Sequence, residues 1–199
     1  EFTKFLSGKI ANELSLLSPN FNLVELYVND NSEGIYIESE TLNESFLRRN
    51  NIMPVNLYKA EQILQESIVG LESNAFNSPG ALSKQAIFNQ LPDNDFSDLS
   101  FFFKLMRLSY DNKQNYENLL SKIGLDNWTT FVAYQIITQN FHNDNSHNFR
   151  LVADPWSGNL IPIVYDPIIG ELNSEDYNFD FSSNDMILLL NKGSLFQQK

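Results

Sequence analysis

Three short segments of this sequence carry side chains that could do chemistry. Lys59 ends the short apolar run 56–59, Asn-Leu-Tyr-Lys. The polar loop 142–148, His-Asn-Asp-Asn-Ser-His-Asn, comes much later, and Asp166 ends the apolar run 161–166. A lysine can bind phosphate, a carboxylate can orient or deprotonate a hydroxyl, and Asp and Asn oxygens are ligands that Mg²⁺ accepts. These residue types together indicate phosphoryl transfer.

The order of these residues along the chain matters more than any one of them. Phosphoryl transfer needs a cation on the nucleotide phosphates, a carboxylate beside the attacking hydroxyl, and oxygen ligands for a metal ion. In protein kinases these groups come as a strand lysine, an Asp…Asn loop, a hairpin, and a metal-binding Asp before Gly. The same order is formed here by Lys59, Asp144, Asn148 and Asp166, with Gly170 four residues further on.

The elements that must position these residues follow from the apolar pattern. Alternation predicts a half-buried strand at 23–29 and a second strand at 35–40, joined into a hairpin by turn-forming residues at 30–34. Helical spacing predicts an amphipathic helix at 3–17, with Phe5, Ile10, Leu14 and Leu17 on its buried stripe. Further elements are expected as a short helix at 42–49, a strand at 55–59, helices at 99–108, 115–123, 128–138 (N-capped by Asp126) and 185–190, and a hairpin at 149–165.

Strands therefore dominate the first third of the chain and helices the rest, which predicts an α+β fold. The 199 residues fit one domain. We expect residues 1–60 to form a small strand-rich N-terminal lobe. Residues 61–199 then form a larger, mainly helical C-terminal lobe that contains the hairpin at 149–165, with the site between the two lobes.

The composition of the chain limits the classes of binding partner and chemical site that it can have. The formal net charge is −12, which disfavours nucleic acids and anionic membrane surfaces and favours basic partners or metal ions. The chain has no cysteine, so disulfides, thiolate metal sites and a cysteine nucleophile are excluded. No apolar run approaches the roughly 18 residues that a bilayer crossing needs, so we expect no membrane insertion.

The segments above resemble the CotH family of secreted and spore-coat kinases. The run 34–40 (Gly-Ile-Tyr-Ile-Glu-Ser-Glu), Phe46-Leu47 and the Leu-Tyr-Lys strand are similar to the first half of that family's pattern. The Asn-x-Asp loop with its following Asn, then Phe-Arg-Leu at 149–151 and Pro-x-x-x-Asp at 162–166, are similar to the second half. The resemblance extends from about Ile10 to Gly170.

This resemblance implies a divergent protein-kinase-like fold that uses ATP with Mg²⁺ or Mn²⁺ and phosphorylates Ser or Thr residues of a protein substrate. Asp144 would be the catalytic acid or base. Lys59 would hold the phosphates, Glu40 would lie near the nucleotide or pair with a cation, and Asn148 and Asp166 would bind the metal. The implied location is extracellular or on the spore or cell surface. Domains of this type are usually larger, so we expect the C-terminal lobe to be truncated after Lys199.

Two other functions stay open. The family's Trp-Asp-x-Asp is Tyr-Asp-Pro-Ile at 165–168, so a second acid is missing, and the chain has no Gly-rich phosphate loop. Asn148 also follows Asp144 by four residues where the common kinase loop has five. These departures fit a catalytically inactive pseudokinase, or a surface adhesion or scaffold domain. The third reading is a metal-dependent hydrolase, because His142, Asp144 and His147 could supply ligands for zinc.

Overall fold

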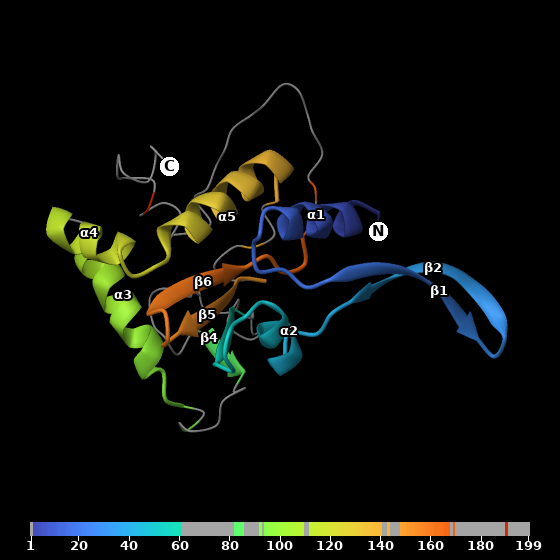
Figure 1. Ribbon diagram of the computed structural model, residues 1–199, viewed down its shortest axis with the longest axis horizontal. Helices are drawn as coiled ribbons and strands as arrows, with labels where there is room; N and C mark the ends of the chain where they lie inside the picture. The colour runs from blue at the N-terminus through green and yellow to red at the C-terminus, as the bar shows by residue number, and fades with distance from the viewer. Residues whose placement is uncertain are drawn as a thin grey trace, which may run out of the picture.

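The computed structural model describes residues 2–60, 82–85, 92, 94–109, 112–140, 143, 148–167, 169 and 190. The chain begins with α1 (Phe2–Glu13), the strands β1 (Phe21–Val28) and β2 (Asn31–Ser39), α2 (Glu44–Arg49), β3 (Leu57–Ala60) and β4 (Leu82–Gln85). It continues with α3 (Ser97–Ser109), α4 (Lys113–Leu120), α5 (Leu125–Thr138), β5 (Arg150–Asp154) and β6 (Asn159–Ile163) (Figure 1). The predicted α+β class is confirmed.

A four-stranded antiparallel sheet in the order β4-β3-β5-β6 forms the centre of the molecule. β3 pairs directly with β5, so a strand from the first 60 residues lies beside the late hairpin β5–β6. The segment after α1 lies along the β6 edge of this sheet. There the amide of Val164 donates to the carbonyl of Leu17 over 2.7 Å. Residues that are distant in sequence therefore meet along one sheet.

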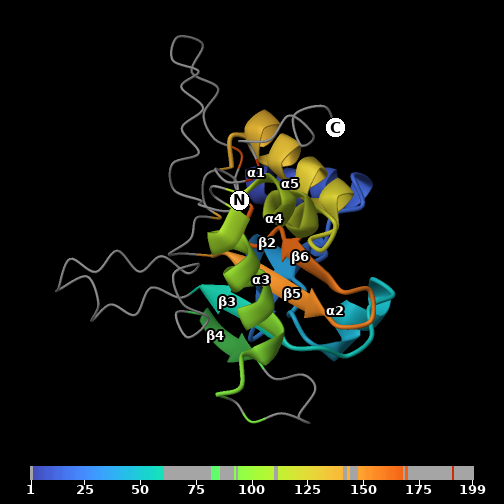
Figure 2. The same cartoon turned by 90° about the vertical axis from the view of Figure 1, so that its left-hand side faces the viewer.

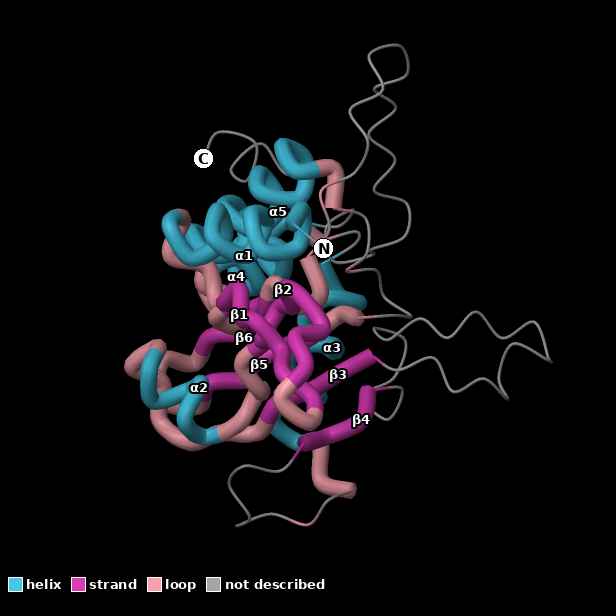
Figure 3. Tube along the Cα trace, turned by 90° about the vertical axis from the view of Figure 1, so that its right-hand side faces the viewer, coloured by secondary structure: helices cyan, strands magenta, loops and turns pink. Residues whose placement is uncertain are grey.

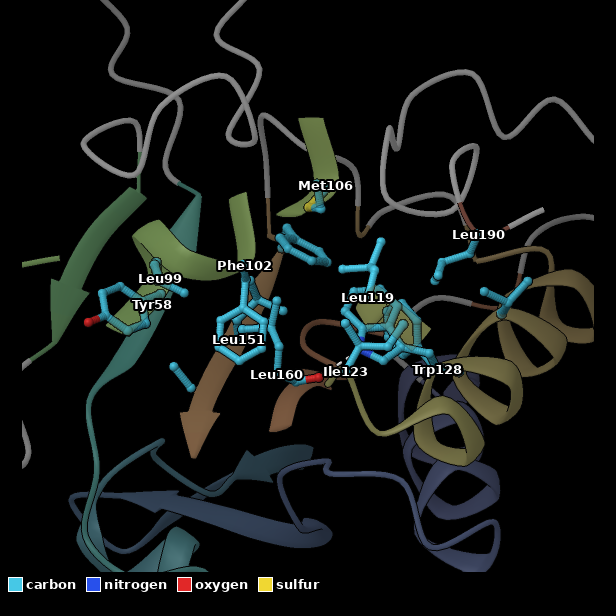
Figure 4. Close-up of a cluster of buried hydrophobic side chains, with 14 of the residues drawn as sticks. Tyr58, Leu99, Phe102, Met106, Leu119, Ile123, Trp128, Leu151, Leu160 and Leu190 are labelled. Atoms are coloured by element: carbon cyan, nitrogen blue, oxygen red, sulfur yellow. Dashed lines mark hydrogen bonds between the residues drawn. The ribbon is translucent and has the colours of Figure 1, made fainter. Parts of the chain in front are cut away.

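Helices cover both faces of this sheet (Figures 2 and 3). Side chains alternate along β5, so Leu151 and Ala153 pack with α3, α4 and α5, while Val152 packs with α2 on the opposite face. The larger cluster is drawn in Figure 4, where Trp128 of α5 lies against Leu160 of β6. A strand buried on both faces is apolar throughout, which is why residues 151–153 do not alternate in polarity.

The helix α1 differs from its predicted form. The predicted apolar stripe is confirmed only in part. Ile10 packs against the larger core cluster, but Leu14 is 43% exposed and the fully buried residues of α1 are Ser7, Gly8 and Ala11. Small residues are needed there because a Cβ atom on Gly8 would overlap the ring of Phe21. The Ser7 hydroxyl also lies 2.5 Å from the hydroxyl of Tyr134, which fixes α1 against α5.

The hairpin β1–β2 is present as predicted, but the predicted half-burial of its first strand is wrong. Both strands are exposed along most of their length, and only Phe21 at the start of β1 is buried. Alternating polarity indicates a strand with two unlike faces, yet it does not say whether another layer covers the apolar one. The hairpin extends away from the rest of the molecule (Figure 1).

Smaller differences concern boundaries. α5 starts at Leu125 after Gly124, whose left-handed φ of 69° ends the preceding turn, so Asp126 lies in the first turn of the helix rather than at its N-cap. The strand β4 was not predicted. The predicted helix at 185–190 lies outside the described residues except for Leu190, which is buried. None of the described helices combines the length and apolar character that a membrane crossing requires.

Candidate functional site

Asp166 and Asn148 lie together at one end of the hairpin β5–β6. Asn148 comes two residues before β5, and Asp166 comes three residues after β6. Because antiparallel strands place the start of one beside the end of the next, the hairpin brings these two side chains to the same place. The Asn148 amide donates to Oδ2 of Asp166 over 3.4 Å.

Both residues have a left-handed backbone, with φ of 57° at Asn148 and 48° at Asp166. Asn and Asp adopt this conformation more readily than other residues with a side chain. Such conformations cost free energy and concentrate at functional sites. Both predicted metal ligands have this conformation, and their side chains are in contact.

The loop that contains Asp144 is anchored beside Asp166. Asn143 is 2% exposed, and its Oδ1 accepts a hydrogen bond from the backbone amide of Tyr165 over 3.3 Å. Asn148, at the other end of this loop, contacts Asp166. Asp144 itself and both histidines lie outside the described residues. The described residue on each side of Asp144 therefore contacts the segment 165–166.

Lys4 of α1 forms an ion pair with Oδ1 of Asp166. The two side chains are 35% and 27% exposed. The sequence analysis missed this contact, because Lys4 precedes Asp166 by 162 residues and no local pattern relates them. The ammonium group on Oδ1 neutralises part of the charge with which Asp166 would attract a metal cation, while Oδ2 faces Asn148.

A second group of predicted residues lines a pocket of about 320 Å³. Lys59 and Glu40 are both part of its wall, together with Arg150 and Tyr165. This volume is at the lower end of the range for small-molecule pockets. Since Tyr165 directly precedes Asp166, the pocket reaches the residue next to the predicted metal ligand.

Lys59 and Arg150 are direct partners in the pairing of β3 with β5. Directly opposed residues point to the same face of a sheet, and two like charges in this position repel each other. Arg150 is only 9% exposed; its Nη1 donates to the carbonyls of Ala60 and Phe149, and its guanidinium stacks 4.5 Å from the Tyr165 ring centre. A bound anion would relieve the repulsion between the two cations.

The sequence analysis gave Arg150 no role of its own. It appeared only within the run Phe-Arg-Leu at 149–151. The register of β3 against β5 places Arg150 opposite Lys59. These strands are far apart in sequence, since Arg150 and Ala60 are separated by 90 residues. No local periodicity carries that information.

Glu40 binds a cation, Arg49 of α2. The carboxylate accepts from Arg49 Nη2 over 2.6 Å and from Nε over 3.2 Å, and its Oε2 also accepts from the backbone amide of Asn20 over 2.9 Å. A two-point contact of this kind fixes both planar groups. Glu40 therefore holds the end of β2 against α2 at the rim of the pocket.

Tyr58 holds β3 in place on the opposite face of the sheet. Its hydroxyl donates to the Asp98 carboxylate of α3, with oxygen distances of 2.6 and 2.7 Å. Burial and the neighbouring Asp98 raise the pKa of Tyr58 well above its ordinary value, so the hydroxyl stays a donor. Since side chains alternate along a strand, this anchor fixes Lys59 toward the pocket.

Asp166 and Asn148 fit a hard divalent cation. Octahedral Mg²⁺ holds its ligands at about 2.1 Å, which places neighbouring ligand atoms about 3 Å apart. The nearest polar atoms of the two side chains are 3.4 Å apart, and rotation of the Asn148 amide would present an oxygen. Within the described ranges no group of three His, Asp or Glu side chains gathers around one point. Substrate phosphate and water would complete such a site.

Arg49 also lines a larger pocket, of about 490 Å³, which contains none of the described residues that the sequence analysis selected. Its polar lining is mostly amide, from Asn12, Asn20, Asn50, Asn51 and Asn127. The ion pair of Arg49 with Glu40 lies between this pocket and the one that holds Lys59.

The arrangement brings a cationic pair, Lys59 with Arg150, into one pocket and joins an acid to an amide close by. Cations of this kind bind phosphate oxygens. A carboxylate and an amide oxygen are suitable ligands for a divalent metal ion that accompanies phosphate. The predicted residues that the structure describes thus form two adjoining groups, linked through Tyr165 and Asp166. Asp144 belongs to the loop anchored beside them.

Comparison with known proteins identifies a family for this chain. The family model described as CotH kinase protein matches residues 4–168, which include every residue of the site. A search of curated proteins found no match. The match covers most of the chain and extends from Lys4 past Asp166, so the chain belongs to the CotH kinase protein family.

Proposed function

We propose that this domain transfers the γ-phosphoryl group of ATP, with Mg²⁺ or Mn²⁺, to Ser or Thr residues of a protein substrate. The observation that carries the proposal is the meeting of three segments around Tyr165 and Asp166. These are the cationic pair on β3 and β5, the ends of the loop 142–148, and the acid that follows β6. A protein that transfers phosphate needs these groups together.

Each residue then has a role in the reaction. Lys59 and Arg150 hold the phosphates. Asp166 and Asn148 would hold the metal ion, which would supply positive charge against the phosphate oxygens. The substrate hydroxyl oxygen forms a bond to the γ-phosphorus while the bond from that phosphorus to the ADP oxygen breaks. The proton of the hydroxyl passes to the carboxylate of Asp144. Glu40 acts through Arg49 and keeps the wall of the pocket in place.

The substrate and location follow from charge and family. A surface with a net charge of −12 attracts proteins rich in Lys and Arg, so we propose a basic substrate. We also propose an extracellular or spore- or cell-surface location, which is what the family resemblance implies. The two-lobed kinase arrangement belongs to this proposal too, with residues 1–60 as the smaller lobe.

The direct test is phosphate transfer from γ-labelled ATP to two synthetic peptides. Both contain Ser, one among Lys and Arg residues and one among Glu residues. We expect label on the basic peptide only, and only when Mg²⁺ or Mn²⁺ is present. Label on both peptides alike would remove the proposed preference for basic substrates, and label without a metal ion would contradict the assigned metal site.

Substitution of Lys59 by Met tests the phosphate contact. A hydrogen bond between charged groups contributes about 1.5–3 kcal/mol, so the KM for ATP is expected to rise roughly 10-fold or more. Lys122→Met is the control, because Lys122 is exposed and its substitution removes the same charge. An unchanged KM in the Lys59 variant, with an unchanged melting temperature, would exclude Lys59 from the phosphate site.

The ion pair of Lys4 with Asp166 favours a second, non-catalytic function. It neutralises the acid that the metal requires. With Ile168 in place of the family's second acid, the chain also fits a pseudokinase or a surface scaffold domain. Nucleotide binding without any transfer to either peptide would favour that function.

The metal-dependent hydrolase stays a prediction of the sequence. Its three ligands, His142, Asp144 and His147, lie outside the described residues. Zinc bound at one equivalent by the wild type and lost in His142→Ala would support it.

A further inference from the structure

The hairpin β1–β2, residues 21–39, is called the arm here. It forms a two-stranded sheet of its own, and no other described strand joins either of its edges. Figure 1 shows it extending away from the four-stranded sheet. A two-stranded hairpin is only marginally stable in water unless it packs against another layer. The arm therefore has two edges with unpaired backbone groups and little cover.

The arm exposes large apolar side chains on both faces. Leu23 and Ile35 belong to one face, at 45% and 65% exposure, and Leu26 and Tyr36 to the other, at 39% and 47%. Tyr27 and Val28, near the turn, are 58% and 46% exposed. Exposed apolar side chains gathered in one region mark interaction surfaces. A strand that is apolar on both faces is typical of one covered on both sides.

The charges of the arm have one sign. Between Phe21 and Ser39 there are four acids, Glu25, Asp30, Glu33 and Glu38, and no Lys or Arg. A second copy of the chain would bring the same acids against them and be repelled. Charged residues on edge strands prevent strands of the same kind from pairing in this way. A segment that carries Lys or Arg is attracted instead.

We propose that the arm is a docking surface for an extended protein segment in which Lys or Arg alternates with apolar residues, and that this segment pairs with β2 as a third strand. Pairing with an exposed edge is a common way in which sheets bind extended peptides. β2 is the more accessible edge, because Phe21 at the start of β1 is buried against Gly8 of α1. The proposal holds whether or not the domain transfers phosphate.

The test uses a labelled synthetic peptide, about 8 residues long to match a strand, in which Lys alternates with Val. Its matched partner alternates Glu with Val. Binding to the full chain is measured by fluorescence anisotropy in EDTA without nucleotide, so the result does not depend on phosphoryl transfer. We expect the Lys peptide to bind, to bind more weakly as salt is raised, and to bind at least about tenfold more tightly than the Glu peptide.

Two double variants locate the binding surface. Glu25→Gln with Glu38→Gln removes charge but keeps side chains that can still bond to Ser32 and Asn22. Leu23→Thr with Ile35→Thr removes apolar surface but keeps residues that favour strands. Each is expected to weaken binding at least about fivefold, a change of about 1 kcal/mol. The control is Ile137→Thr, because Ile137 is 72% exposed on α5.

Backbone pairing is tested with N-methyl groups on the peptide. Methylation of every second amide on one edge is expected to abolish binding, while methylation on the other edge leaves it intact, because only one edge faces β2. The proposal is overturned if both methylated peptides bind equally, or if neither double variant weakens binding. It is also overturned if the chain dimerises and Leu23→Thr with Ile35→Thr converts the dimer to a monomer, since a second copy would then be the partner.

Discussion

Asp166→Asn is expected to lower the rate of phosphoryl transfer by about 10³-fold or more while the fold stays intact. The substitution keeps the shape of the side chain and removes the charge that would hold the metal. Metal ions contribute several kcal/mol to stabilisation of the transition-state charge, and about 1.4 kcal/mol corresponds to a tenfold change in rate. The rate is measured with γ-labelled ATP and the basic Ser peptide under saturating metal.

Stability must be separated from activity in this experiment. The ion pair with Lys4 is lost in the variant, but both side chains are partly exposed, and such pairs contribute about 0–1 kcal/mol. The melting temperature should therefore change little. Glu117→Gln, on α4, is the control for loss of one negative charge. Transfer at the wild-type rate in Asp166→Asn would show that this acid does not bind the metal.

Trp128→Ala is expected to destabilise the domain more than any surface change. Trp128 is fully buried, its indole NH donates to the carbonyl of Leu160 over 2.7 Å, and its ring meets Phe131 edge to face at 5.9 Å. Truncation of a buried aromatic residue costs about 3–5 kcal/mol. The carbonyl left without its donor adds about 1–3 kcal/mol. A total of about 5 kcal/mol approaches the whole stability of many domains.

The measurement is urea unfolding followed by far-ultraviolet circular dichroism, which does not depend on tryptophan fluorescence. With an m-value of about 2 kcal/mol per M, the midpoint should fall by about 2.5 M, or the variant should be unfolded in buffer. The matched control is Trp156→Ala, because Trp156 is 70% exposed in the turn between β5 and β6. Equal midpoints for the two variants would mean that α5 does not pack on this sheet as described.

Local patterns predicted most elements of this fold correctly. The hairpin β5–β6 was identified because its apolar strands enclose a turn with Pro, Gly and Asn, and α3 and α5 because of their apolar spacing. Burial was predicted less well. The arm and α1 both carry apolar patterns whose exposure depends on which layer lies next to them, and that is set by distant residues such as Phe21 beneath Gly8.

The same distinction applies to the site. Asp166 and Asn148 could be placed together from sequence, because one hairpin joins them. Lys59 and Arg150 could not, since their contact depends on the register between β3 and β5. Lys4 gave no signal at all, because α1 reaches Asp166 only through the tertiary packing of its small residues. Composition and order thus indicate which chemistry to expect, while the fold determines which cations take part.

We propose that the site around Lys59, Arg150 and Asp166 binds ATP together with a divalent metal ion. It is tested most directly by calorimetric titration of ATP into the full chain, with Mn²⁺ and with EDTA, in the wild type and in Asp166→Asn. We expect binding at one equivalent in the wild type with Mn²⁺, and at least about tenfold weaker binding in EDTA and in the variant. Equal binding of ATP in all of these conditions, or none in the folded wild type, would contradict it.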